Sequence, residues 1–325
     1  MRDLDGSVGI EPAVSGASAS RILVTGSSGL IGTALGQALA VSGHRVRGFD
    51  LVARTLHERG DVLCRASLDE AVSDCDGIVH LAAVSRVVWG ERQPDLCVAT
   101  NVGGTRNVLG AALSSRRRPW VIFASSREVY GRQAHLPVHE EVELSPINVY
   151  GRTKAQSERD LEDARAAGLQ TAVVRLSNVY GSVDDHCDRV IPAFVRAAVG
   201  GGSIRVDGRD NTFDFTHLDD TVAGICAVID MLASGEAPPP IHLLTGRPTT
   251  LGELAATTVR LAGTRTEIRD APPRRYDVGC FYGSPERARE LLGWRPRIGL
   301  EEGLSRLVAD FRKESSVPSR RAQGA

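Results

Sequence analysis

The stretch RILVTGSSGLIG, residues 21–32, decides the fold of this chain. Its first five residues are apolar enough to form a short buried strand. Its three glycines follow at G-x-x-G-x-x-G spacing, and apolar residues then recur at helical spacing in Ile31, Leu35 and Leu39. A glycine-rich turn between a strand and a helix lets the backbone approach a pyrophosphate, which lies at the helix N-terminus. The stretch therefore predicts a dinucleotide-binding unit.

A second strand is expected at Arg45–Phe49, and it ends in Asp50. A carboxylate at this position can accept hydrogen bonds from an adenosine ribose. It would repel a 2′-phosphate, so the sequence favours NAD over NADP. Asp61 and Val62 follow and could lie against the adenine.

Further strands alternate with helices along the chain. Residues 78–83 predict a fourth strand, Asn101 opens a helix through Ala112, and Val121–Ala124 form the next strand. This alternation predicts an α/β fold, a Rossmann-type doubly wound parallel sheet. We expect a disordered leader over 1–20, an NAD-binding domain over 21–178 with returns near 212–244, a substrate lobe over 179–312 and a tail over 313–325.

A candidate reaction centre follows the strand at Val121. Ser126 ends that strand, and Tyr150 and Lys154 stand four residues apart at the start of an expected helix, on one face. A nearby ammonium favours a phenolate, so we expect Lys154 to lower the pKa of Tyr150 and make it a base. Only two lysines occur beside thirty-seven arginines, which marks Lys154 as chosen for its chemistry.

Composition excludes several other classes of protein. The 325 residues carry a net charge of -1, which favours neither nucleic acid nor an anionic membrane as a partner. The six scattered cysteines predict no metal site and no disulfide framework, and they fit a cytoplasmic location. No apolar run predicts a membrane span.

Taken together, these motifs resemble the NAD-dependent epimerase/dehydratase family, the extended short-chain dehydrogenases/reductases that act on nucleotide sugars. The resemblance covers residues 21–312 and rests on TGSSGLIG at 25–32, HLAA at 80–83, NVGGT at 101–105, SSREVYG at 125–131, YGRTK at 150–154, RLSNVYG at 175–181, DFTHLDD at 214–220 and LLGWRP at 291–296.

The resemblance implies roles for matching residues and a homodimer formed by the helices near Asn101 and Tyr150. It implies catalysis by Ser126, Tyr150 and Lys154, with Glu128 as a further candidate. The cofactor residues would be Gly26, Ser28, Gly29, Leu30, Ile31, Gly32, Asp50, Asp61, Val62, Leu81, Ala82, Ala83, Asn101, Tyr150 and Lys154. The substrate residues would be Ser85, Ser126, Arg127, Asn178, Arg205, Phe213, Arg274 and Arg275.

Three positions depart from the family pattern. Simple 4-epimerases of the family usually carry a small or neutral residue at the position of Glu128, whereas 4,6-dehydratases and glucuronate decarboxylases carry an acid there that can handle protons beside a ketone. Arg127 replaces the aspartate that precedes this acid in 4,6-dehydratases, and it cannot donate a proton as an acid. Phe213 replaces an arginine that grips phosphate or a sugar carboxylate.

The resemblance and its departures favour a nucleotide-sugar epimerase that works through a transient 4-keto sugar. Beside that ketone, Glu128 could also assist epimerisation at C3 or C5. The main alternative is a dehydratase that uses Glu128 as acid or base. A decarboxylase is disfavoured by Phe213, and a ketone reductase by Asp50. A non-catalytic NAD-binding regulator is disfavoured by the retained Ser126, Tyr150 and Lys154.

Overall fold

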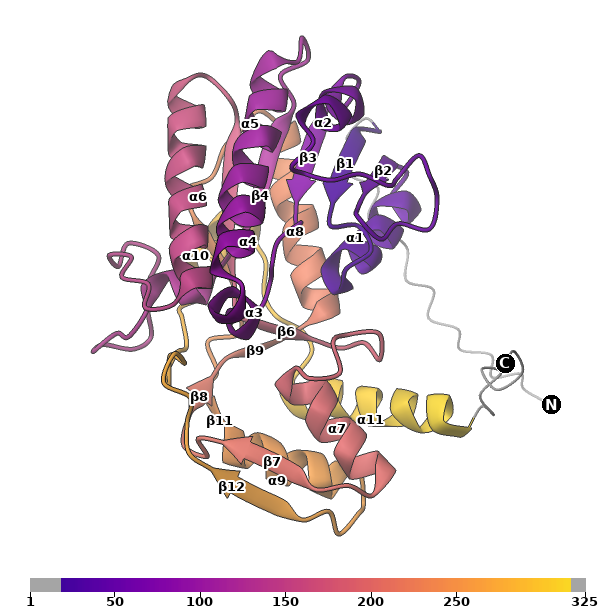
Figure 1. Ribbon diagram of the computed structural model, residues 1–325, viewed down its shortest axis with the longest axis vertical. Coiled ribbons are helices and arrows are strands. Elements are labelled where there is room, and N and C mark those ends of the chain that lie inside the picture. The colour runs from indigo at the N-terminus through magenta and orange to yellow at the C-terminus, as the bar shows by residue number, and fades with distance from the viewer. Residues whose placement is uncertain (1–18, 317–325) are drawn as a thin grey trace, which may run out of the picture.

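A six-stranded parallel sheet organises the computed structural model, which describes residues 19–316 (Figure 1). Its strand order is β10-β5-β4-β3-β1-β2, and every neighbouring pair runs parallel. The strands are β1 (Arg21–Thr25), β2 (Arg45–Phe49), β3 (Gly77–His80), β4 (Trp120–Ser126), β5 (Thr171–Leu176) and β10 (Ile241–Leu243).

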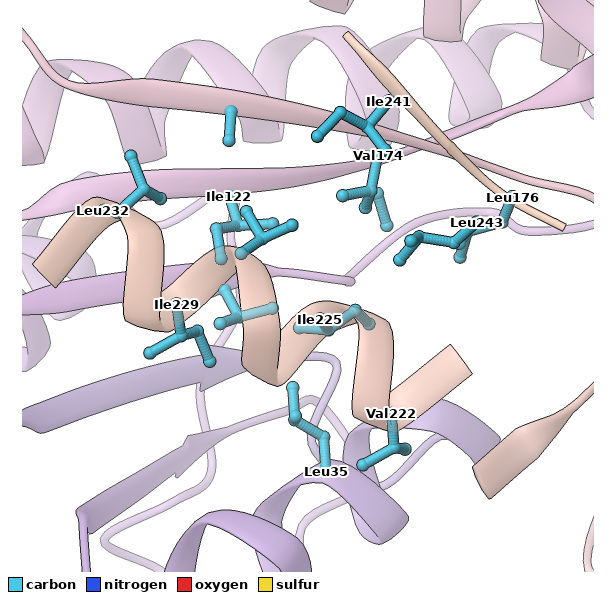
Figure 2. Packing of buried hydrophobic residues seen from close by; sticks show 14 of the residues in the cluster. Leu35, Ile122, Val174, Leu176, Val222, Ile225, Ile229, Leu232, Ile241 and Leu243 are labelled. Atoms are coloured by element: carbon cyan, nitrogen blue, oxygen red, sulfur yellow. The ribbon is translucent and has the colours of Figure 1, made fainter. Parts of the chain in front are cut away.

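Helices cover both faces of this sheet, which confirms the doubly wound fold. Leu35 and Leu39 of α1 pack with α8 against one face, where Ile122 and Val174 also lie (Figure 2). The other face packs against α2, α5 and α6. These helices are α1 (Leu30–Val41), α2 (Arg65–Val72), α5 (Gly104–Ser114), α6 (Val149–Ala166), α8 (Leu218–Ala233) and α10 (Glu286–Leu292), the last packing beside α8.

A smaller second lobe has its own apolar core. Helices α7, α9 and α11 pack together there, with Phe213 and Phe215 in the same cluster. Its elements are β6 (Asn178–Tyr180), α7 (Val190–Gly200), β7 (Ile204–Asp207), β8 (Thr212–Phe213), β9 (Phe215–His217), β11 (Thr249–Thr250), α9 (Leu251–Leu261), β12 (Ile268–Ala271) and α11 (Leu300–Ser316). Three two-stranded pairs, β6–β9, β7–β12 and β8–β11, complete the lobe.

Several expected elements need correction. Residues 78–83 were expected to form the fourth strand, but β3 is the third, because the chain between β2 and α2 forms turns. The helix expected from Asn101 belongs to a longer helical run through α4 (Pro94–Val98) and the π-helical turn η1 (Ala99–Gly103). The expected tail begins inside α11, and the leader falls outside the described residues up to residue 18.

No helix within residues 19–316 is both long enough and apolar enough to cross a membrane.

Candidate active site

A cavity of about 580 Å³ lies where the strands β1, β3 and β4 end and the second lobe begins. In parallel α/β sheets, ligands bind beyond the carboxyl ends of the strands. The lining combines residues of the glycine turn, the end of β4, the start of α6 and the second lobe. Both predicted halves of the site, for cofactor and for substrate, therefore share one cavity.

The glycine turn leaves no space for a Cβ at Gly26 or Gly32. Gly26 has a φ of +72°, and a Cβ there would meet the Ala82 nitrogen at 2.7 Å. A Cβ on Gly32 would lie 2.2 Å from the Gly26 oxygen. The main chain can therefore come close to a bound group at the start of α1, as a dinucleotide pyrophosphate requires.

Asp50 closes the adenosine side of the turn. Its carboxylate accepts hydrogen bonds from the backbone nitrogens of Ser28 at 3.0 Å and Val52 at 3.0 Å. A carboxylate fixed beside the glycine turn fits a ribose with free hydroxyls and opposes a 2′-phosphate.

Most predicted cofactor residues line the cavity. These are Gly26, Gly29, Leu30, Ile31, Gly32, Asp50, Val62, Leu81, Ala82, Ala83, Tyr150 and Lys154. Ser28, Asp61 and Asn101 are not among the lining residues. Asp61 instead accepts a hydrogen bond from the Leu63 nitrogen, and the buried Asn101 side chain joins Val84 to Thr153.

The start of α6 places the tyrosine and the lysine. Asn148 caps this helix by accepting a hydrogen bond from the Gly151 nitrogen at 2.8 Å. One turn later, the Lys154 ammonium donates to the Ala124 carbonyl of β4 at 2.7 Å. Tyr150, Lys154 and Ser126 are all buried along the cavity wall. The predicted trio therefore comes together.

Burial is the largest cause of the pKa shifts of Tyr150 and Lys154. It raises the pKa of Tyr150 to about 12, although a hydrogen bond with Ser126 and the charge of Arg189 lower it. Burial also lowers the pKa of Lys154 from 10.5 to about 8. The expected net lowering of the Tyr150 pKa is therefore wrong for the protein alone, because desolvation of the phenolate outweighs the Ser126 hydrogen bond and the charge of Arg189.

Arg127 and Glu128 form an ion pair in the cavity wall. Their side chains meet at 2.8 Å, and the second Glu128 oxygen accepts a hydrogen bond from Asn148 at 2.7 Å. The Arg127 guanidinium lies 4.5 Å above the Phe213 ring. Two departures that are far apart in the sequence, Arg127 and Phe213, thus stack on each other.

The remaining predicted substrate residues divide into two groups. Ser85, Asn178, Arg205, Phe213 and Arg274 line the cavity, whereas Arg275 does not. Asn178 donates from its side chain to the Asp214 carbonyl at 3.2 Å.

Arg205 and Arg274 share one carboxylate in the second lobe. Arg205 pairs with Asp207 at 2.7 Å and Arg274 with the same side chain at 3.2 Å. A carboxylate held between two arginines leaves further guanidinium donors for a phosphate or a nucleobase.

The sequence did not predict one wall of the cavity, here called the roof, which is formed by α3 (Val87–Arg92) and the loop before α7. Arg86 pairs with Asp188 and lies 5.2 Å from the Trp89 ring centre. Asp185 lies 3.5 Å from Arg189, and its side chain is only 1% exposed. The ion pair of Arg86 with Asp188 joins distant segments, so no local pattern marks it, whereas the i,i+4 spacing of Asp185 and Arg189 is a local signal that could have found that pair.

Across the described residues, no group of three or more His, Cys, Asp or Glu side chains is placed to hold a metal ion.

A Rossmann-type sheet with a closed glycine turn, a strand-end carboxylate and a buried Ser–Tyr–Lys trio defines a dinucleotide-dependent enzyme. The chain belongs to the NAD dependent epimerase/dehydratase family, whose model matches residues 22–243. Its cofactor is NAD, and its class is that of NAD-dependent nucleotide-sugar epimerases and dehydratases.

Known proteins resemble the chain over nearly its whole length. UDP-glucose 4-epimerase of Mycolicibacterium smegmatis is 30% identical, over 91% of this chain and 99% of the relative. UDP-glucuronic acid decarboxylase 6 of Arabidopsis thaliana is 28% identical, over 92% of this chain and 91% of the relative. The structure of UDP-glucose 4-epimerase with UDP-glucose from Thermotoga maritima gives a TM-score of 0.84 at 27% identity, covering 91% of this chain and 99% of that one.

Proposed function

We propose that this protein is a nucleotide-sugar epimerase that inverts C4 through a transient 4-keto sugar. The observation that carries the proposal is the buried trio of Ser126, Tyr150 and Lys154. Next to it, Glu128 forms an ion pair with Arg127. NAD, when bound, supplies a hydride acceptor whose oxidised ring is positively charged. No net oxidation results, because the hydride returns to the same sugar.

Tyr150 removes the proton from the C4 hydroxyl in this proposal, and Ser126 holds the same substrate oxygen. Arg189 and the Ser126 hydrogen bond both favour the phenolate. Lys154 is fixed by its bond to the Ala124 carbonyl, so its charge stays beside the reacting groups. After the 4-keto sugar turns over and presents its other face for hydride return at C4, Tyr150 gives the proton back to the C4 oxygen.

The contacts of Glu128 favour inversion at C4 over elimination of water. One of its oxygens meets Arg127 and the other accepts from Asn148. A carboxylate with both oxygens engaged is poorly placed to take a proton from C5 or to protonate a leaving hydroxyl. Glu128 still lines the cavity, so a dehydratase that frees this carboxylate on substrate binding is the second candidate.

NMR of products in heavy water separates these candidates. The NAD-loaded protein is given hexoses and hexuronates carried on UDP, dTDP and GDP. We expect one substrate to be inverted at C4 with no deuterium incorporated and no atom lost. Deuterium at C3 or C5 would assign a role to Glu128, and loss of a hydroxyl or a carboxyl would overturn the proposal in favour of a dehydratase or decarboxylase.

Two further expectations belong to the same proposal. A homodimer through α5 and α6 is supported by the family, and by the half-exposed Leu96 and Val98 on the adjoining helix α4. A cytoplasmic location is supported by six cysteines that are all free. Sedimentation of the purified protein tests the dimer.

A further inference from the structure

A buried ion pair lies behind the reaction centre and outside the cavity lining. The Glu158 carboxylate of α6 meets Nη2 of Arg175, on β5, at 2.6 Å, and Nε of the same guanidinium lies 3.1 Å and 3.2 Å from its two oxygens. The two side chains are only 4% and 6% exposed. Removing two charges from water costs about as much free energy as such a pair recovers. The pair is therefore weak evidence for stability and points to a role in placing the elements that it joins.

Glu158 also fixes α6 to the end of β4. Its Oε1 accepts a hydrogen bond from the Ser125 hydroxyl. One turn earlier on α6, the Lys154 ammonium donates to the Ala124 carbonyl at 2.7 Å. Two side chains on one face of the helix therefore hold consecutive residues of the strand, and the next residue, Ser126, carries the hydroxyl of the trio.

Arg175 is held in place from its other side. Its Nη1 donates to the Tyr130 hydroxyl at 2.6 Å and to the Glu140 carbonyl at 2.8 Å. In the sheet, Arg175 is the β5 residue paired with Ser125 of β4. The guanidinium and the serine hydroxyl thus approach Glu158 from neighbouring strands. Because both of these donors are fixed by the sheet, the carboxylate and the turn of α6 that carries it are fixed as well.

We propose that Glu158 is a positioning residue for Lys154, a role that rests on the function proposed above. Its contacts with Ser125 and Arg175 hold this part of α6 on β4, so the Lys154 ammonium stays 5.8 Å from the centre of the Tyr150 ring. Glu158 does not line the cavity, so it acts through Lys154 and not on the substrate. Its charge also favours the protonated lysine and works against the burial that lowers the Lys154 pKa to about 8.

The two lysines of the chain allow a direct measurement that needs no substrate. The NAD-loaded protein is labelled with a carbon isotope at lysine Cε, so that NMR shows Lys154 and Lys313, and Lys154→Met identifies the Lys154 signal. Glu158→Gln keeps the size of the side chain and removes its charge. It should lower the pH at which Lys154 titrates by about one pH unit, as expected for the loss of a nearby opposite charge. The Lys313 signal is the internal reference.

Turnover then separates the placement of Lys154 from a role in stability alone. Glu158→Met combined with Arg175→Met removes the ion pair without leaving a charge behind, and apolar replacement of this kind often preserves stability. We expect this double variant to unfold at an unchanged or higher urea concentration. It should lower kcat about 10- to 100-fold, because a small displacement of a reacting group has a large effect on rate. The KM and the affinity for NAD should change less than about threefold, since the pair contacts neither ligand.

Asp160→Asn is the matched control, because Asp160 lies on the same helix but pairs with the largely exposed Arg106 of α5 at 2.9 Å. It should change neither the Lys154 titration nor kcat. The proposal is overturned if Glu158→Gln leaves the Lys154 titration unchanged, or if the double variant is folded and keeps its full kcat.

If neither of these variants folds, Ser125→Ala decides, because it removes only the bond between β4 and Glu158. A kcat lower by about threefold or more at unchanged KM supports the proposal, and an unchanged kcat overturns it. If no sugar reacts with the unmodified protein, the epimerase proposal fails, whereas the NMR titration still decides the role of Glu158.

Discussion

The cofactor half of the cavity is built from main chain and strand ends, whereas the half that we propose for the sugar is built from side chains, some of which meet across long sequence distances. On the cofactor side, Gly26 and Gly32 close a turn in which even a Cβ would collide. On the sugar side, Arg127, which directly follows β4, stacks on Phe213 from the second lobe. The first half follows from backbone geometry, and the second depends on which side chains the fold brings together.

This difference explains how one family can keep its cofactor and vary its substrate. A turn made by glycines tolerates almost no substitution, because each added atom strains the backbone. A cavity wall made of ion pairs can exchange its members, as long as every buried charge keeps a partner. Arg127, Glu128 and Phe213 form one such wall, so we expect substitutions there to alter the choice of sugar and leave NAD binding intact.

The largest effect is expected where the two halves meet, at Tyr150. Tyr150→Phe removes the proton-transfer group and should lower kcat by about 10²- to 10⁴-fold. Retention of NAD should not change. Tyr180→Phe is the control, since Tyr180 also lines the cavity but its hydroxyl makes only a 3.4 Å contact with the Leu300 carbonyl. Equal losses in both variants would contradict the assignment of Tyr150.

A methyl group in the glycine turn should break the cofactor half. Gly32→Ala places Cβ 2.2 Å from the Gly26 oxygen, so the turn must move, and overpacking of this kind costs about 1–3 kcal/mol. We expect NAD affinity to fall about 10- to 100-fold in a fluorescence titration. Gly36→Ala in the same helix meets nothing within 4 Å and should leave affinity unchanged. An equal effect of both variants would argue against a tight turn.

Loss of the aromatic platform should affect the sugar half alone. Phe213→Leu keeps an apolar side chain but removes the ring beneath Arg127, a contact worth about 0.5–2 kcal/mol. The KM for the preferred sugar should rise about 2- to 30-fold with NAD affinity unchanged, as measured by steady-state kinetics and NAD titration. A change in NAD affinity without a change in KM would contradict the division of the cavity.

The last expected effect is on stability and concerns the buried lysine and pH. Burial lowers the pKa of Lys154 from 10.5 to about 8, so between these values the unfolded chain binds more protons than the folded one. Stability therefore rises with pH in this window relative to Lys154→Met, with a slope of at most about 1.4 kcal/mol per pH unit. Denaturant unfolding of the unmodified protein and of Lys154→Met from pH 7 to 10.5 measures this pH dependence of the unfolding free energy. Parallel pH profiles would show that Lys154 is not desolvated.

The sequence predicts the cofactor half well because its signals are local. The strand Arg21–Thr25, the glycine turn and the periodic Leu35 and Leu39 lie within one short segment, and they occur as expected in β1 and α1. Tyr150 and Lys154 are also local, since one helix places both. Their pKa values could not be predicted, because desolvation depends on the elements that cover them.

The sugar half escapes prediction because its contacts are long-range. Arg127 and Phe213 were recognised as separate departures, but no sequence pattern shows that they stack. Arg86 and Asp188, an ion pair in the roof, are separated by 102 positions. Arg275 was expected at the substrate and does not line the cavity, whereas its neighbour Arg274 does. Neighbouring residues in a loop can point their side chains in different directions, and only the folded structure determines which of them faces the cavity.

The most direct test of epimerisation at C4 follows a single hydrogen. The sugar nucleotide that reacts fastest is prepared with deuterium on C4 and incubated with the NAD-loaded protein in ordinary water. We predict a C4 epimer of unchanged mass that keeps its deuterium on C4, because the hydride leaves and returns within one active site. Loss of the label to water, or a product lighter by water or carbon dioxide, would contradict it.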